Sequence, residues 1–216
     1  GTVMLGSSTA LGNSMVTLNT SAVLDLNGYS VTVPWFQNTD GTGTITNSNN
    51  LVLATLTAGT AGSNNLTFNG SITGNLSLSL INTDAWYLGG TNTYSGSTKI
   101  SNVVYLILGG ANSLPSSTVL YMYDSATLIL AAGTTTIGGL SSASQNARIA
   151  TNGDATLNIN TGVNDYQYNG IFLDNNSLIP FPYASYSSGV MSITKSGTGV
   201  LTFGHTDSNS GSTFSG

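Results

Sequence analysis

Charged residues are scarce in this chain. Only 3 of its 216 residues are Lys or Arg and 8 are acidic, all of them Asp, so charged side chains make up 5 % of the sequence. An ordinary soluble domain carries about 25 %. Glu, Lys and Arg, on which helical bundles and coiled coils depend, are nearly absent. A net charge of −5 also excludes the basic surface that nucleic-acid binding requires.

Cysteine is absent, which excludes a disulfide scaffold and a cysteine-ligated metal site. Long apolar runs are absent too. The longest, residues 103–108, has the length of one strand, whereas a membrane span needs about 20 apolar residues. The sequence opens without an initiator Met or a basic, apolar leader. We therefore expect that targeting signals were removed or that the sequence is part of a longer chain.

Ser, Thr, Asn and Gly are abundant, with 27 glycines, and 39 % of the residues are hydrophobic. This hydrophobic fraction and the low charge density argue against disorder. Short β-type runs such as 15–18, 22–26, 30–33 and 43–46 recur about every ten residues, and Gly, Asn or Ser follows most of them. The composition predicts an all-β fold.

The chain repeats itself. Residues 88–98 and 203–213 are identical at six of eleven positions, and residues 21–26 match residues 125–130. We predict a single continuous segment, 1–216, made of two sequence repeats, about 1–102 and 103–216. The second repeat carries an aromatic- and proline-containing insertion at about 163–188. The end of the second copy continues almost in phase into the start of the first, as expected of a tandem array or of a unit that stacks on copies of itself.

Repetition of this kind favours a parallel β-helix, or β-solenoid, over the alternative, an antiparallel β-sandwich. In a solenoid each inward side chain meets its counterpart one coil away, at about 4.8 Å. Stacked like charges are unfavourable at that distance, which gives the scarcity of charge a physical cause. At about 20–25 residues per coil, we expect about ten coils.

Two stretches share a motif of strand, turn, strand and then Gly-x-Asn-Thr-Tyr-Ser-Gly-x-Thr. They are residues 88–98 with 106–114, and residues 193–204 with 210–213. The motif resembles the autotransporter-associated β-strand repeat, or passenger-associated transport repeat, family. The resemblance implies a right-handed parallel β-helix in a secreted or surface-displayed bacterial protein, with no chemistry in the repeats. The repeat-motif turns that it implies are Gly89, Tyr94, Gly96, Gly204 and Gly211.

Catalytic constellations are not apparent in the sequence. A β-helix lyase or hydrolase needs several Asp with Arg or Lys on one face, but this chain has one Arg and two Lys. Most Asp residues adjoin Gly, Asn or Ser, which is typical of Asx turns. Asp165 and Asp174 are the one pair that could form a catalytic or calcium site, although calcium needs six to eight oxygen ligands. We expect no enzyme activity, no catalytic or metal-binding residue and no cofactor.

The insertion concentrates aromatic residues. Six of the 18 aromatics lie there: Tyr166, Tyr168, Phe172, Phe181, Tyr183 and Tyr186. Aromatic side chains dominate interface energetics and stack on sugars. These residues are candidates for a lateral or inter-subunit interface or a glycan platform, and the alternative is a loop that covers apolar surface on the side of the solenoid.

These features predict a structural extracellular β-solenoid, a stalk or self-assembling fibre segment of a bacterial surface or secreted protein. Copies of the chain are the expected partners, head to tail or laterally. The alternative is an adhesin or carbohydrate-binding passenger that uses the insertion to bind surface glycans. Neither nucleic acid nor a membrane span in this segment is expected. An ice-binding solenoid, suggested by residues 42–44 and 134–136, needs one Thr pair per coil, and the sequence does not show that row.

Overall fold

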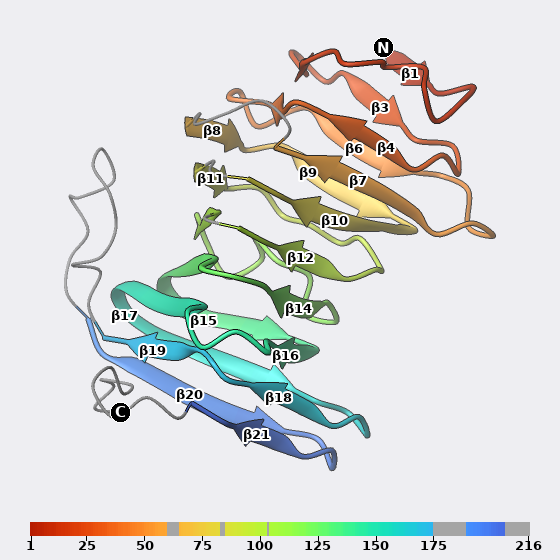
Figure 1. Cartoon of the computed structure of the whole chain (residues 1–216). Helices are drawn as coiled ribbons and strands as arrows, with labels where there is room; N and C mark the ends of the chain where they lie inside the picture. The colour runs from red at the N-terminus through yellow and green to blue at the C-terminus, as the bar shows by residue number, and fades with distance from the viewer. Residues whose placement is uncertain (60–64, 83–84, 103, 175–188, 206–216) are drawn as a thin grey trace.

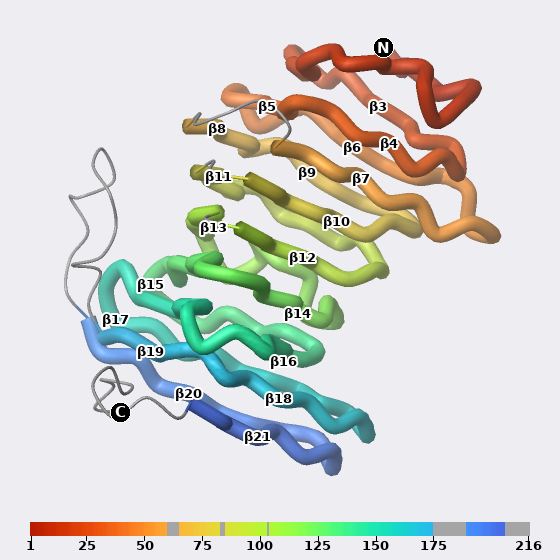
Figure 2. The backbone as a smooth tube through the Cα atoms, in the orientation of Figure 1, coloured from red at the N-terminus to blue at the C-terminus, as the bar shows by residue number. Residues whose placement is uncertain are grey.

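The computed structural model describes residues 1–59, 65–82, 85–102, 104–174 and 189–205, and these residues form strands and turns without a helix. Every strand pair among them is parallel. The strands are piled along one axis in about seven turns (Figures 1 and 2). This arrangement confirms the all-β parallel solenoid and contradicts the antiparallel sandwich.

Three sheets form the sides of the stack. The first face contains β1 (Thr2–Met4), β3 (Val23–Asp25), β6 (Thr44–Asn47) and β9 (Ser71–Gly74). The second face contains β4 (Val31–Val33), β7 (Ala54–Ala58), β10 (Leu76–Leu80), β12 (Thr98–Ile100), β14 (Val119–Met122) and β16 (Gly139–Ser141). The third face contains β8 (Asn65–Phe68), β11 (Ala85–Leu88), β13 (Tyr105–Leu108), β15 (Thr127–Ile137), β17 (Arg148–Asn160) and β19 (Ile171–Leu173).

Shorter strands extend these faces toward the ends. β2 (Val16–Thr17) pairs with β5 (Phe36–Gln37), which continues the third face through a bridge between Asn38 and Phe68. β18 (Tyr166–Tyr168) pairs with β21 (Leu201–Phe203) and continues the second face through a bridge between Ser142 and Tyr168. β15 and β17 bend from the third face to the first, where β20 (Met191–Ser196) pairs with β17.

Equivalent positions recur after 20 to 27 residues through most of the stack, as Leu66 with Trp86 and Ile45 with Ile72 show. The last step on the first face takes 36 residues, from Ala155 to Met191. The expected ten coils are therefore wrong: the described residues form about seven turns, and the steps of 27 and 36 residues exceed the assumed 20–25.

The division into two long repeats stays a prediction. Residues that it aligns lie on different faces of the solenoid: Leu24 is in β3 of the first face, and Leu128 is in β15 of the third. Likewise, Leu88 ends β11, and Phe203 ends β21. The periodicity that the backbone follows is the single turn.

Side chains at alternate strand positions point inward and stack from turn to turn. On the third face one such row consists of Leu66, Trp86, Leu106, Leu128, Ile149 and Phe172, and all six are buried. The ring of Trp86 lies 4.7 Å from that of Phe36 between centroids. Burial of apolar area in these continuous rows is the main favourable term of folding.

The corner between the second and third faces is built from residues with positive φ. Gly59, Asn82, Asn102 and Asp124 follow successive strands of the second face, with φ of 112°, 71°, 63° and 54°. Gly, Asn and Asp adopt this conformation more readily than other residues. Asn82 Nδ2 donates to the Gly59 carbonyl oxygen, and Asn102 N donates to Asp124 Oδ2 at 3.1 Å. The abundance of Asn and Gly thus reflects repeated corners.

Candidate binding groove on the first face

The first face is interrupted in the middle of the stack. Residues 91–95 still follow β9, because Thr93 N donates to Ile72 O at 2.9 Å and Ser95 N donates to Gly74 O at 3.0 Å. The next turn, residues 111–117, forms no strand. The chain returns to the first face as a strand only in the second half of β15.

Asn92 and Tyr94 close the core behind this interruption. The buried Asn92 side chain accepts a hydrogen bond from Ile72 N at 2.7 Å and donates one to Ser113 O at 2.8 Å. The Tyr94 hydroxyl lies 2.5 Å from Thr98 Oγ1 inside the core. Burial raises the pKa of Tyr94 above its usual range, against the opposite effect of its hydrogen bond with Thr98. The polar side chains behind the interruption therefore have hydrogen-bond partners within the chain.

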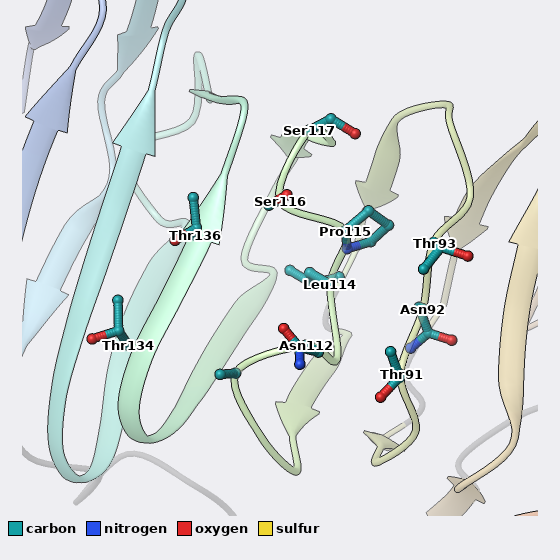
Figure 3. A pocket seen from close by; sticks show the side chains of 11 residues that line it. Thr91, Asn92, Thr93, Asn112, Leu114, Pro115, Ser116, Ser117, Thr134 and Thr136 are labelled. Carbon is teal, nitrogen blue, oxygen red and sulfur yellow. The ribbon is translucent and has the colours of Figure 1, made fainter.

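A cavity of about 430 Å³ occupies the interrupted position. Figure 3 shows that its walls come from three successive turns. The lining residues are Thr91, Asn92, Thr93, Ala111, Asn112, Leu114, Pro115, Ser116, Ser117, Thr134 and Thr136. Leu114 and Pro115 are buried at its base, while the Ser, Thr and Asn112 side chains at its rim reach solvent.

A second cavity of about 400 Å³ adjoins the first at the corner with the second face. Ser116 and Ser117 line both cavities. The other lining residues are Val119, Gly138, Asn160, Thr161, Gly162, Asn164 and Tyr166. We call the two cavities together the corner groove. None of its lining residues is charged.

The ring of Tyr166 lies over a glycine of the preceding turn. A Cβ atom on Gly139 would lie 2.5 Å from Tyr166 Cζ, so a side chain at position 139 would displace the ring. The Tyr166 side chain is partly exposed and lines the second cavity. It is the one described aromatic of the predicted set that lines the corner groove.

Other predicted aromatic residues are placed differently. Tyr168 is 0 % exposed and Phe172 is 2 % exposed, and their ring centroids lie 4.9 Å apart in the core. This position argues against the predicted role of these two residues in binding a partner, because inward strand positions continue the core rows. Phe181, Tyr183 and Tyr186 lie outside the described residues.

The predicted turn residues differ in role. Gly89 follows β11, Gly96 precedes β12 and Gly204 follows β21, so these three lie between strands. Tyr94 also lies between strands, but its side chain fills the core. Gly211 lies outside the described residues.

The aspartates that the structure describes cap backbone groups. Asp25 accepts hydrogen bonds from Asn27 N at 2.9 Å, Ser48 N at 3.0 Å and Ser48 Oγ at 2.6 Å. Burial raises the pKa of Asp25, but the hydrogen bonds from Ser48 and Asn27 outweigh it and hold the pKa below its usual value. Hydrogen bonds from Thr20 N and Thr42 N, together with those from the Asn38 and Thr42 side chains, likewise lower the pKa of Asp40.

Asp165 and Asp174 each tie one turn to the next. Asp165 Oδ1 accepts from Val200 N at 2.7 Å, and Asp174 Oδ1 accepts from Met191 N at 2.8 Å. Within the described ranges, no group of three or more His, Cys, Asp or Glu side chains could hold a metal ion. Nor does that part of the chain contain a helix of the length and hydrophobicity that would span a membrane.

Rows of hydroxyl groups flank the groove, which sequence reasoning missed. Paired residues occupy the outward positions of six turns: Thr44 and Thr46, Ser71 and Thr73, Thr91 and Thr93, Thr134 and Thr136, Thr156 and Asn158, and Ser192 and Thr194. Unequal turn lengths hide this row in the sequence. A signal for the groove itself was available, since residues 109–117 contain Pro115 and no strand-like alternation.

No protein-family model matches the chain, and searches among curated proteins and solved structures found no match. The resemblance to the autotransporter-associated repeat therefore stays a prediction from the motif at residues 88–98 and 193–204.

Proposed function

We propose that this chain is a structural segment of an extracellular stalk or fibre that extends by stacking head to tail. One observation carries the proposal: among the described residues, the inward row of the first face ends on both sides of the stack in a residue that is not fully buried. At one end Val3 continues the row of Leu24 and Ile45 and is 60 % exposed. At the other end Ile193 follows Leu157 and is partly exposed.

The backbone edges at the two ends are complementary as well. Leu5 N donates to Asp25 O, and Gly1 O accepts from Val23 N, both at 2.9 Å, so the odd-numbered residues of β1 face β3. The N–H group of Met4 consequently faces away from β3, where no described strand lies. An edge of this kind is a template for pairing with another strand.

At the far end, β20 presents the matching edge on the same face. Ala155 N donates to Val190 O, and Thr161 N donates to Ser196 O, so the N–H groups of Ile193 and Lys195 face away from β17. A parallel strand in the register of β1 would satisfy these groups and place Val3 over Ile193. Such a contact repeats the same surface pair at every junction and gives an open, heterologous assembly.

A bacterial surface or secreted protein is the context that we propose for this role. The motif resemblance supports it, and so does a fold whose stability rests on stacked rows instead of ion pairs. A stalk needs length and stiffness more than reactive groups, and a solenoid supplies both, because each turn contacts only its neighbours.

The test is the association state of the chain. Light scattering after size-exclusion chromatography over a range of concentrations, with negative-stain electron microscopy, should show rods whose mass increases with concentration. Val3→Lys should give monomers, because the exposed end of the row would have to bury an ammonium group. Leu51→Lys is the matched control: Leu51 is 96 % exposed and follows β6, two strands in from the β1 edge, so this variant should associate as the unmodified chain does.

Two results would overturn the proposal. One is a chain that stays monomeric at every concentration. The other is a Val3→Lys variant that retains its circular dichroism spectrum and still associates like the Leu51→Lys control.

A further inference from the structure

We propose that the corner groove is a binding site for a neutral oligosaccharide. The site is independent of the end-to-end contact, because it opens on the side of the stack. The inference rests on the size, the lining and the pre-formed ring of the groove.

The groove is long enough for a chain of sugar rings. Its two adjoining cavities, of about 430 and 400 Å³, each fall within the about 300–1,000 Å³ that is usual for ligand sites. The lining runs from the turn of Thr91 to that of Asn160, three inter-strand steps of about 4.8 Å, or roughly 14 Å along the axis. An elongated ligand that crosses several turns fits this shape better than a compact one.

The lining selects a neutral, hydroxylated ligand. Anions are bound by Arg and Lys, and calcium is bound by carboxylates, but no charged residue lines the groove. The side-chain oxygens of Thr91, Thr93 and Thr134 have no hydrogen-bond partner in the part of the chain that the structure describes. Hydroxyl and amide groups both donate and accept, as sugar hydroxyls do, whereas an apolar ligand would leave them unpaired.

Tyr166 supplies a face on which a sugar ring can stack. Its ring lies over Gly139 and is partly exposed at the second cavity. A ring already packed against the backbone loses less entropy on binding than a free one. Leu114 and Pro115 add an apolar base to the first cavity. The polar rim can hydrogen-bond to the hydroxyl groups of a pyranose. The apolar base and the aromatic ring can contact its C–H faces.

Ice is the competing ligand for the Thr rows, because a crystalline water surface also presents regularly spaced oxygens. A flat surface would need an unbroken array, and the rows stop at residues 111–117, where the groove lies. Ser and Asn also replace Thr at Ser71, Asn158 and Ser192. The concavity therefore favours a discrete ligand.

The experiment is titration calorimetry of the 216-residue chain with neutral pentasaccharides of the cello, manno, malto and xylo series, with oligogalacturonate as the acidic arm. Ser117→Leu places an apolar side chain where the two cavities meet. Since Ser117 is exposed in a turn, the fold should be unaffected. Ser14→Leu makes the same change at another exposed position, away from the groove.

We expect at least one neutral pentasaccharide to bind with a Kd of millimolar or below, with little dependence on salt. Ser117→Leu should weaken that binding about tenfold or more, and Ser14→Leu should leave it unchanged. The proposal is overturned by a failure of all four neutral series to bind, by binding that survives Ser117→Leu, or by binding of the acidic arm alone. Adsorption to ice without sugar binding, measured by thermal hysteresis, would overturn it as well.

Discussion

Asp25 illustrates how a residue of this solenoid contributes to stability through backbone capping. Its side chain is 4 % exposed, and its carboxylate accepts three hydrogen bonds from Asn27 and Ser48. Hydrogen bonds donated to a carboxylate stabilise its ionised form relative to its protonated form. Its pKa is accordingly lower in the folded chain than in the unfolded one.

The substitution Asp25→Asn should destabilise the fold by about 1–3 kcal/mol at pH 7, because it removes the charge from those hydrogen bonds. A lowered folded pKa gives stability that is present above the unfolded pKa of about 3.9 and is lost as the pH falls through the folded pKa. The difference between the two proteins should thus shrink below about pH 4. Urea denaturation of both proteins at pH 7 and pH 3 measures this difference in the free energy of unfolding.

Asp154→Asn serves as the control for that experiment. Asp154 is exposed and accepts one bond, from Val190 N at 2.9 Å, so its replacement should change the free energy of unfolding by less than about 0.5 kcal/mol. Equal losses in the two variants, or a loss in Asp25→Asn that does not vary with pH, would contradict the prediction.

Substitutions of Trp86 distinguish the contribution of core packing to stability from the cost of a buried, unpaired polar group. Its side chain is 1 % exposed, and its Nε1 has no hydrogen-bond partner among the described residues. Trp86→Phe removes an unpaired donor along with some volume and should cost less than about 1.5 kcal/mol. Trp86→Ala leaves a cavity beside Phe36 and should cost about 3–5 kcal/mol. Chemical denaturation of both variants tests this, and equal losses would show that packing does not dominate.

At the scale of the element, glycines such as Gly96 allow neighbouring turns to approach each other closely. A Cβ on Gly96 would collide with the Leu76 carbonyl oxygen and with Ser77 Oγ of the turn before. Around Gly110, in contrast, no atom lies within 4 Å of the position that a Cβ would take, and neither glycine has positive φ. The two positions form a matched pair.

Gly96→Ala should therefore destabilise the fold by about 1–3 kcal/mol and raise amide exchange in β10 and β12, which it would force apart. Gly110→Ala should be neutral or slightly stabilising, since it lowers the entropy of the unfolded chain. Hydrogen exchange read by mass spectrometry, together with thermal unfolding, compares the two. A Gly110→Ala variant as unstable as Gly96→Ala would contradict the steric explanation.

At the scale of the whole molecule, stability should be unequal along the axis, because each turn contacts only its neighbours. A turn inside the stack packs on both sides, whereas β1 and β21 each pair with a single strand among the described residues. Local opening follows the number of contacts that must be broken.

Native-state hydrogen exchange of the monomer should give the highest protection in β11 to β15 and the lowest in β1 and β21. At concentrations where the chain associates, β1 and β20 should gain protection, because the junction would pair their open edges. Uniform protection along the chain would contradict the first expectation, and association without protection at β1 would place the contact elsewhere.

Much of the fold could be read from the sequence for local reasons. Low charge, short β-type runs and turn residues predicted an all-β fold, because turn chemistry acts between adjacent residues. Repetition in the sequence favoured the parallel solenoid over the sandwich. The motif resemblance placed Gly89, Gly96 and Gly204 in turns. Local reasoning assigned the aspartates to turns, since an Asx turn needs only a few adjacent residues.

The groove and the core positions of Tyr168 and Phe172 depended on tertiary structure. Whether an aromatic residue points inward depends on strand register, and a shift of one residue reverses it. Thr91, Ser117 and Thr134 come together only because turns of unequal length bring them to one face, and no spacing in the sequence encodes that alignment. The sequence by itself determined that this protein is a stack of β-strand turns that contain few charged residues. The tertiary structure decided which side chains each face presents, because that depends on how the turns are aligned.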